Sequence, residues 1–261
     1  MGFADRMVRV LLLVGLLGAA PGAALAKGKK LSTGDTKTDG MMVALQEKTK
    51  AVEACTGKMV TTLRMMGQEV AIQYDAAFKR PNRIRLDLIQ AGAVLATIVS
   101  DGGLLWVYEA GEKLVTKVNR SRVYRATELE ADADQPDPIR PFRGLVWPSI
   151  RYAGDETVGA RTLRVFEALP KPNPMQAQLP VAPVKVKIYV DSEDGLLRTV
   201  RSYDAAGAEI MIQQFSDVRV TPNLADSRFE FVIPAGAHVI DATDDTVQLL
   251  KALKEKEQAG Q

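Results

Sequence analysis

The chain has very few of the side chains on which most enzyme mechanisms depend. Among its 261 residues there is one cysteine, Cys55, and one histidine, His238, far apart in the sequence. A single cysteine excludes an internal disulfide, and neither residue stands in a local nucleophile signature. The sequence also lacks a glycine-rich phosphate loop and the spacing of zinc ligands. We therefore predict no enzymatic activity, no catalytic residues, no metal site and no cofactor.

The sequence also has no large excess of positive or negative charge. The formal net charge is +2, from 34 lysines and arginines against 32 aspartates and glutamates. Such a balance gives no electrostatic basis for nucleic acid binding. Asp132, Asp134 and Asp137 make one loop acidic, but this loop lacks the glycine and the terminal glutamate of a calcium-binding loop. We interpret it as a solvated loop.

The N-terminus has the pattern of a secretory signal peptide. Arg6 and Arg9 precede an apolar run over 10–20, which is too short to span a bilayer, and Ala24-Leu25-Ala26 is a small-x-small cleavage site. We expect cleavage after Ala26, which places the mature chain in the periplasm. Residues 27–40 are polar and small, and are interpreted as a flexible tether.

The next segment has the pattern of an amphipathic helix. Asp39 is a candidate N-cap, and the helix is expected over residues 41–55. Cys55 would then be a core thiol at the end of this helix. Apolar or small side chains fall along one side of it, namely Met42, Leu45, Thr49 and Val52.

Alternation of apolar and polar residues begins at Gly57 and continues to Asn119. Because side chains alternate between the two faces of a strand, this period predicts antiparallel strands separated by short turns. Strands are expected over 58–66, 69–78, 82–89, 93–100, 104–109 and 113–118, and, after a helical segment at 123–131, over 161–168, 184–191, 196–204, 208–215 and 217–221. A proline-rich loop is expected at 169–183, and a helical tail over 243–256.

Methionine, branched and aromatic side chains recur at alternate positions of the first group of strands. This pattern has two interpretations: the ordinary core of a sandwich, or a concave sheet lined for an apolar ligand, in which methionine supplies adaptable contacts. The residues concerned are Met59, Leu63, Met65, Ile72, Tyr74, Ile84, Leu86, Ile98, Trp106 and Tyr108.

Two sets of motifs resemble the LolA family of periplasmic lipoprotein carriers. The first set is Lys79-Arg80-Pro81-Asn82, then Val99-Ser100-Asp101-Gly102 and Leu105-Trp106-Val107-Tyr108. The second set, near the C-terminus, falls in the family's order, and the resemblance covers about residues 41–241. Its members are Gly195-Leu196, Asp204, Gly207, Phe215, Phe229-Glu230-Phe231, Pro234 and Gly236.

The resemblance implies a mainly β fold of the α+β type. This is an unclosed antiparallel β-barrel, or half-barrel, whose open side is covered by lid helices. The helix at 41–55 and the segment 123–150 stand where the family has its lid. The resemblance thus implies one lipid-binding domain over 41–241, followed by an additional tail over 242–261. Arg80 matches the arginine that, in the family, binds lid carbonyls and holds the empty carrier closed, and the ten alternating residues would line the cavity for acyl chains.

The implied function is that of a soluble, non-catalytic carrier that moves acylated lipoproteins or related lipids toward the outer membrane. Its implied partners are this cargo, an inner-membrane release complex and an outer-membrane acceptor, and we expect a monomer. The superfamily also includes lipid-sensing regulatory domains that act on a membrane partner, which is the alternative. A third possibility is a structural module whose half-barrel is permanently filled by its own side chains.

Overall fold

The computed structural model describes residues 32–65, 67–128, 136–171 and 181–259. The signal peptide predicted at 1–26, most of the tether, Asp132 and Asp134 lie outside these ranges. The elements in chain order are α2 (Thr36–Lys50), β1 (Ala54–Met65), β2 (Gln68–Lys79), β3 (Arg83–Gln90), β4 (Ala93–Ser100), β5 (Leu104–Glu109), β6 (Leu114–Asn119), α3 (Arg120–Thr127), η1 (Trp147–Ser149), β7 (Arg151–Val158), β8 (Arg161–Ala168), β9 (Lys185–Asp191), β10 (Leu197–Tyr203), β11 (Glu209–Val220), η3 (Asp226–Phe229), β12 (His238–Asp241) and α4 (Thr243–Ala259).

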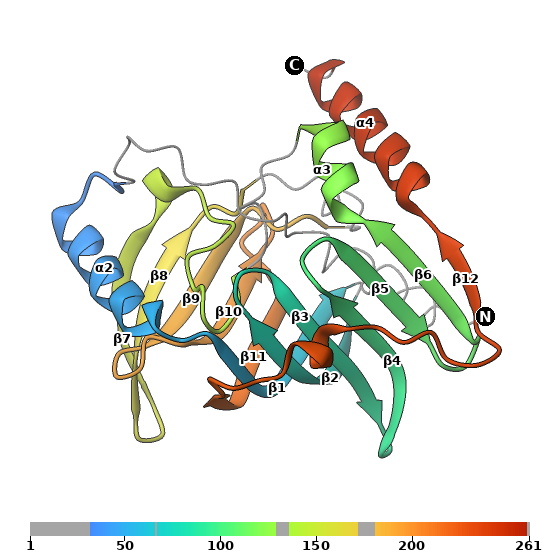
Figure 1. Ribbon diagram of the computed structural model, residues 1–261. Helices are drawn as coiled ribbons and strands as arrows, with labels where there is room; N and C mark the ends of the chain where they lie inside the picture. The colour runs from blue at the N-terminus through green and yellow to red at the C-terminus, as the bar shows by residue number, and fades with distance from the viewer. Residues whose placement is uncertain (1–31, 66, 129–135, 172–180, 260–261) are drawn as a thin grey trace.

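The strands form a single curved sheet (Figure 1). Its order is β12-β6-β5-β4-β3-β2-β1-β11-β10-β9-β8-β7, and all neighbours are antiparallel except β12 and β6. The two end strands, β12 and β7, do not pair with each other, so the barrel is unclosed. The predicted half-barrel is confirmed.

Alternation along the strands separates an inner, concave face from an outer, convex face. The pairs Met59–Tyr74, Leu86–Ile98 and Leu105–Val118 are in register and share the concave face. This face carries most of one continuous hydrophobic core. Burial of such apolar area stabilises the fold by about 25 cal/mol per Å².

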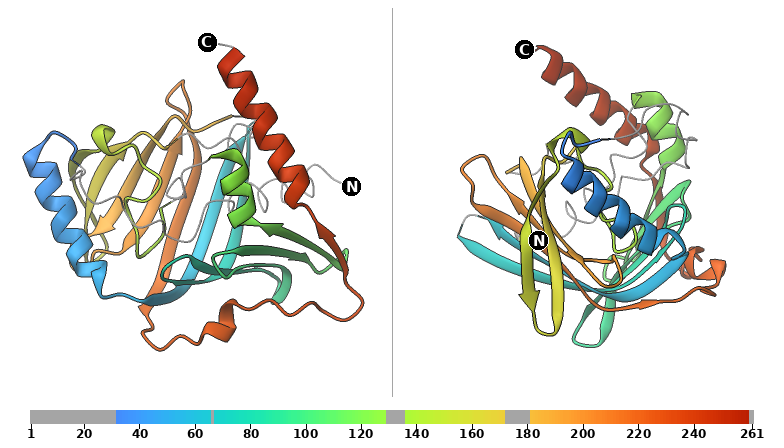
Figure 2. Two further views of the ribbon diagram at one scale, coloured as in Figure 1. Left: turned by 45° about the horizontal axis from the view of Figure 1, so that its top comes forward. Right: turned by 90° about the vertical axis from the view of Figure 1, so that its left-hand side faces the viewer.

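Two groups of elements cover the concave face (Figure 2). We call α2 and residues 136–150 the lid; α2 lies near β7 and β8, and α3 and α4 lie at the opposite end of the sheet, near β6 and β12. Val123 of α3 and Leu250 of α4 enter the same core as the lid side chains. The tail helix therefore packs on the domain.

The chain between β11 and β12 crosses the convex face. We call residues 221–237 the strap. Phe229 of the strap is buried, and Phe231 stacks on Trp106 with ring centroids 5.4 Å apart. At the other end of the sheet, the convex face has its own small cluster of Leu163, Val165 and Tyr189.

The first helix begins earlier than the sequence pattern predicts. Asp35 accepts hydrogen bonds from the backbone of Lys37 and Thr38 and from the Thr38 hydroxyl, so it caps α2 in place of Asp39. Residues 36–40 thus belong to the helix and not to a tether. The helix ends at Lys50, and Cys55 lies in β1. The predicted buried side of the helix is confirmed.

Two observed strands, β7 and β12, were not predicted from the sequence. The two strands predicted at 208–215 and 217–221 form one continuous strand, β11. β7 is an edge strand with mostly exposed side chains, and β12 has only four residues, all exposed. β11 continues through the predicted break at Ser216, and the next residue, Asp217, has a φ of 52° and lies in a bulge opposite Gly57. A Cβ atom on Gly57 would lie 2.8 Å from the Ser216 carbonyl oxygen, so the bulge requires glycine there. No helix among the described residues is long and apolar enough to cross a membrane.

Candidate functional site

Most of the predicted cavity residues lie together on the concave face. They come from β1 to β4, and all but the partly buried Ile84 are buried in the core cluster. Met65 belongs to β1, but its side chain lies outside the described part of the molecule. The residues that lie on this face are Met59, Leu63, Ile72, Tyr74, Ile84, Leu86 and Ile98.

Trp106 and Tyr108 are not on this face, so their prediction as cavity residues is wrong. Val107 of β5 pairs with Ile98, so Leu105 and Val107 point to the concave side and Trp106 to the convex side. There Phe231 of the strap lies 5.4 Å from the Trp106 ring and 6.4 Å from the Tyr108 ring, measured between centroids. Both aromatic residues therefore anchor the strap.

Lid side chains fill the concavity. Met42 and Leu45 of α2 and Leu145 of the second lid segment are fully or almost fully buried in the shared core. Phe142 packs edge-on against Phe166 of β8, with ring centroids 5.2 Å apart. In the described structure, the lid therefore covers the apolar surface of the concave face, and we call this arrangement the closed state.

Arg80 connects the sheet to both parts of the lid. It follows β2, and its guanidinium donates through Nε to the Val52 carbonyl at 3.0 Å and through Nη2 to the carbonyls of Thr49 and Ile139, both at 3.2 Å. Thr49 lies in the last turn of α2, where carbonyls lack helical partners and a cation is favoured. Partial burial and the nearby Arg140 lower the pKa of the Arg80 guanidinium, which stays charged because arginine titrates far above neutral pH.

The lid returns this contact through Arg140, which the sequence analysis did not single out, and Asp137, whose interpretation as part of a solvated loop is wrong because it is buried and paired with Arg140. Arg140 donates to the Pro81 carbonyl, and to the Asn82 side-chain oxygen at 2.7 Å. The buried Asp137 accepts from Arg140 Nε, also at 2.7 Å. We call Arg80, Asn82, Asp137 and Arg140 the clasp. The sequence signal that could have indicated the clasp is the oppositely charged pair Asp137 and Arg140, which stands among prolines beside the apolar Ile139.

A second contact holds α2 against the turn between β9 and β10. Lys48 Nζ donates to the carbonyls of Ser192 at 2.7 Å and Glu193 at 3.0 Å. Gly195, with a φ of +75°, lies so close to α2 that a Cβ atom there would be 2.7 Å from the Leu45 carbonyl oxygen. Side-chain contacts and close packing, not strand pairing, thus fix α2.

Cys55 lies beneath the closed lid. It is fully buried on the concave face opposite Phe78, and burial, together with the nearby Asp137, raises the pKa of its thiol to about 12. His238 is exposed on β12, and five strands lie between β12 and β1 in the sheet. The structure does not bring the two residues together.

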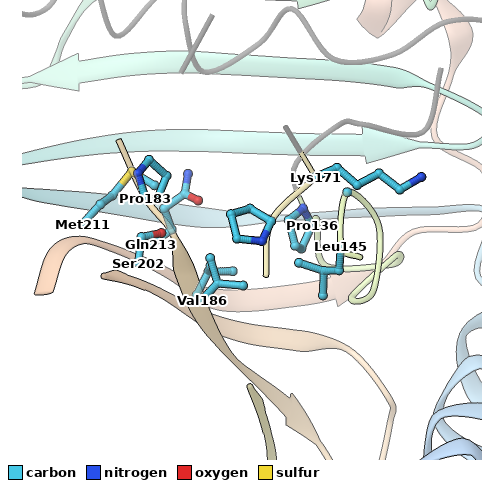
Figure 3. Close-up of a pocket in the computed structure, with 11 residues that line it drawn as sticks. Pro136, Leu145, Lys171, Pro183, Val186, Ser202, Met211 and Gln213 are labelled. Atoms are coloured by element: carbon cyan, nitrogen blue, oxygen red, sulfur yellow. The ribbon is translucent and has the colours of Figure 1, made fainter. Parts of the chain in front are cut away.

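A small cavity lies between the lid and the concave face of β9, β10 and β11 (Figure 3). Its volume is about 20 Å³, and its floor is formed by β9, β10 and β11. Pro136 and Leu145 of the lid form part of its rim. In chemical terms, the site as a whole is an apolar trough under a cover held by hydrogen bonds.

No family model matches the chain. The sequence is 27% identical over 186 residues to an outer-membrane lipoprotein carrier protein of Albidiferax ferrireducens, a match that covers 70% of this chain and 81% of the relative. This similarity confirms the resemblance to the LolA family. The sequence is also 24% identical over 214 residues to an uncharacterized protein of Methanocaldococcus jannaschii, which covers 80% of this chain and 56% of that relative. The chain thus spans about half the length of this archaeal relative.

The fold also occurs in a solved structure of very different sequence. An uncharacterized conserved protein from Thermus thermophilus superposes with a TM-score of 0.52 at 9% identity, over 79% of this chain and 99% of that one. At this identity, the similarity concerns the fold alone.

Proposed function

We propose that this chain is a soluble periplasmic carrier that binds the acyl chains of lipoproteins or related lipids on its concave face. The similarity to a relative named an outer-membrane lipoprotein carrier protein supports this proposal. The observation that carries it is the set of three bonds from Arg80, two to the lid carbonyls of Thr49 and Ile139 and one to the Val52 carbonyl just after α2. These few hydrogen bonds hold the lid over the apolar concave face. Because they are few and exchangeable with water, the lid can open and close reversibly.

The energetics of an acyl chain suit such a trough. Burying a chain gains about 0.8 kcal/mol per CH₂, so a ~16-carbon chain leaves water with a gain of about 13 kcal/mol. In the closed state, Met42, Leu45 and Phe142 cover the same apolar surface. The lid and the cargo then compete for one surface, so closure of the lid helps to expel the cargo. Arg80 acts as the lid lock in this scheme.

The cycle needs a donor and an acceptor. We propose that an inner-membrane release complex loads the monomeric carrier and that an outer-membrane acceptor receives the cargo. A lipid-sensing domain would use the same trough but would retain its ligand. Transfer from the loaded protein to acceptor vesicles distinguishes the two: release to the vesicles supports the carrier, and retention supports the sensor.

The two tryptophans allow a test of where acyl chains bind. Trp147 of the lid packs against the concave core, whereas Trp106 lies on the convex face. We expect a fatty acid brominated along its chain to quench Trp147, because quenching by bromine requires close contact. The quenching should persist in Trp106→Phe and disappear in Trp147→Phe, measured by fluorescence titration.

Each tryptophan variant is the control for the other. Both keep one indole and an aromatic ring at the altered site, so a general loss of binding would affect both alike. Saturable quenching that survives in Trp147→Phe and vanishes in Trp106→Phe would place the ligand on the convex face and contradict the proposal.

A further inference from the structure

We propose that Gln213 and Ser202 form a polar seat for the ester or amide carbonyl that joins an acyl chain to its head group. This inference rests on the proposed acyl-chain carrier function and deepens it. It means that the trough recognises acylated compounds and not hydrocarbon in general, and it places the polar end of the cargo at the cavity between β9, β10 and β11.

Both residues face the trough. Gln213 of β11 is in register with Thr61 of β1 on one side and with Val200 of β10 on the other. Ser202 pairs with Met211, so it lies diagonally next to Gln213 on the same face. Both line the cavity, with apolar neighbours that include Val186 and Met211 (Figure 3).

The Ser202 hydroxyl makes no hydrogen bond to another described residue, and the residue lines the cavity. Only 2% of its surface is exposed, and it lies in a strand whose neighbours on this face are mainly apolar. The Gln213 side chain, which is half-buried, also has no such partner within the described part of the chain. Both polar side chains therefore line the cavity with hydrogen-bonding capacity that no described residue uses, and a polar ligand atom in the cavity would use it.

Three of the residues that line the cavity are prolines, and one, Lys171, has a charged donor. Pro136, Pro170 and Pro183 line it, and proline has no backbone N–H. The volume of about 20 Å³ is close to the space that one water needs, which is also the size of one carbonyl oxygen. The Gln213 amide and the Ser202 hydroxyl are both able to donate to such an oxygen.

The position of the cavity suits an acyl chain whose polar end is held there. The clasp lies where β1 begins, near Cys55, and Gln213 pairs with Thr61 further along β1. At about 3.3 Å per residue, these two points of β1 are roughly 20 Å apart. The intervening concave face is apolar, so a hydrocarbon tail seated at Gln213 would extend toward the clasp.

The test compares an ester with a plain hydrocarbon of similar length. Methyl laurate and tetradecane each displace a bound fluorescent dye, anilinonaphthalene sulfonate, from wild type, Gln213→Leu and Ser202→Ala. We expect Gln213→Leu to weaken methyl laurate about threefold to tenfold, and Ser202→Ala to weaken it in the same direction. Tetradecane should bind the variants as tightly as wild type, or more tightly.

The adjacent glutamine provides the matched control. Gln214 is exposed on the convex face, so Gln214→Leu makes the same chemical change one position away and should alter neither ligand. If Gln213→Leu weakens both ligands equally, or neither, the polar seat is overturned while the carrier function stands. If wild type binds neither ligand saturably, the carrier function and the seat both fail.

Discussion

Arg80→Leu is expected to raise the alkylation rate of Cys55 about tenfold to a hundredfold in a protein that remains folded. The thiol lies beneath the lid with a pKa of about 12, so it reacts only when the lid opens. Arg80 is half-buried and its guanidinium donates to three backbone carbonyls, so leucine leaves no large core cavity. Hydrogen bonds from a charged group contribute about 1.5–3 kcal/mol, and each ~1.4 kcal/mol changes the opening equilibrium tenfold.

Arg125→Leu is the matched control for this measurement. Arg125 is exposed on α3 and donates to the Ser121 carbonyl of its own helix, so its loss removes the same charge without touching the lid. Arg80→Lys should fall between wild type and Arg80→Leu, because lysine lacks the planar fork. Arg80→Leu should also retain acyl cargo and transfer it poorly. Wild-type alkylation and transfer rates in Arg80→Leu would show that Arg80 does not lock the lid.

Gly195→Ala is expected to displace α2 at its second contact, with the turn between β9 and β10. The added Cβ atom would lie 2.7 Å from the Leu45 carbonyl oxygen and 3.0 Å from the Lys48 Cβ atom, and a backbone oxygen cannot rotate away. Overpacking of this kind costs about 1–3 kcal/mol. We therefore expect faster alkylation of Cys55 and weaker contact between Lys48 and the β9–β10 turn.

Gly207→Ala separates this clash from backbone strain. Gly207 has a φ of +82°, close to the +75° of Gly195, but a Cβ atom there would meet nothing within 4 Å. The strain of a left-handed alanine, about 1–2 kcal/mol, is thus common to both variants. Urea unfolding and Cys55 alkylation are measured side by side. Equal effects of the two substitutions would mean that α2 tolerates the extra methyl group and is not held by close packing at Gly195.

The strands and the identity of most trough residues could be read from the sequence, because alternation directly reports which side chains share a face. Trp106 and Tyr108 could not be assigned in this way. Both faces of β5 are apolar, so the pattern gives no preference. Both residues are only partly buried, and the ring that covers them is that of Phe231, which lies far along the chain on the strap.

The clasp shows the limit of sequence reasoning in another form. The family motif identifies Arg80, but its partners are backbone carbonyls, which every residue has, so no side-chain pattern marks them. Asp137 and Arg140 were hidden in a proline-rich, acidic stretch that resembles a solvated loop. Only the packing of Ile139 into the core draws that stretch onto the clasp.

The central claim is that the closed trough opens to take up one acylated ligand. Native mass spectrometry of the folded, detergent-free protein, incubated with a palmitoylated lipopeptide and with the same peptide lacking the acyl chain, tests it most directly. The account predicts a saturable one-to-one complex with the acylated peptide alone. A folded protein that remains bare with both peptides would contradict it, and would show that the half-barrel is permanently filled by its own side chains.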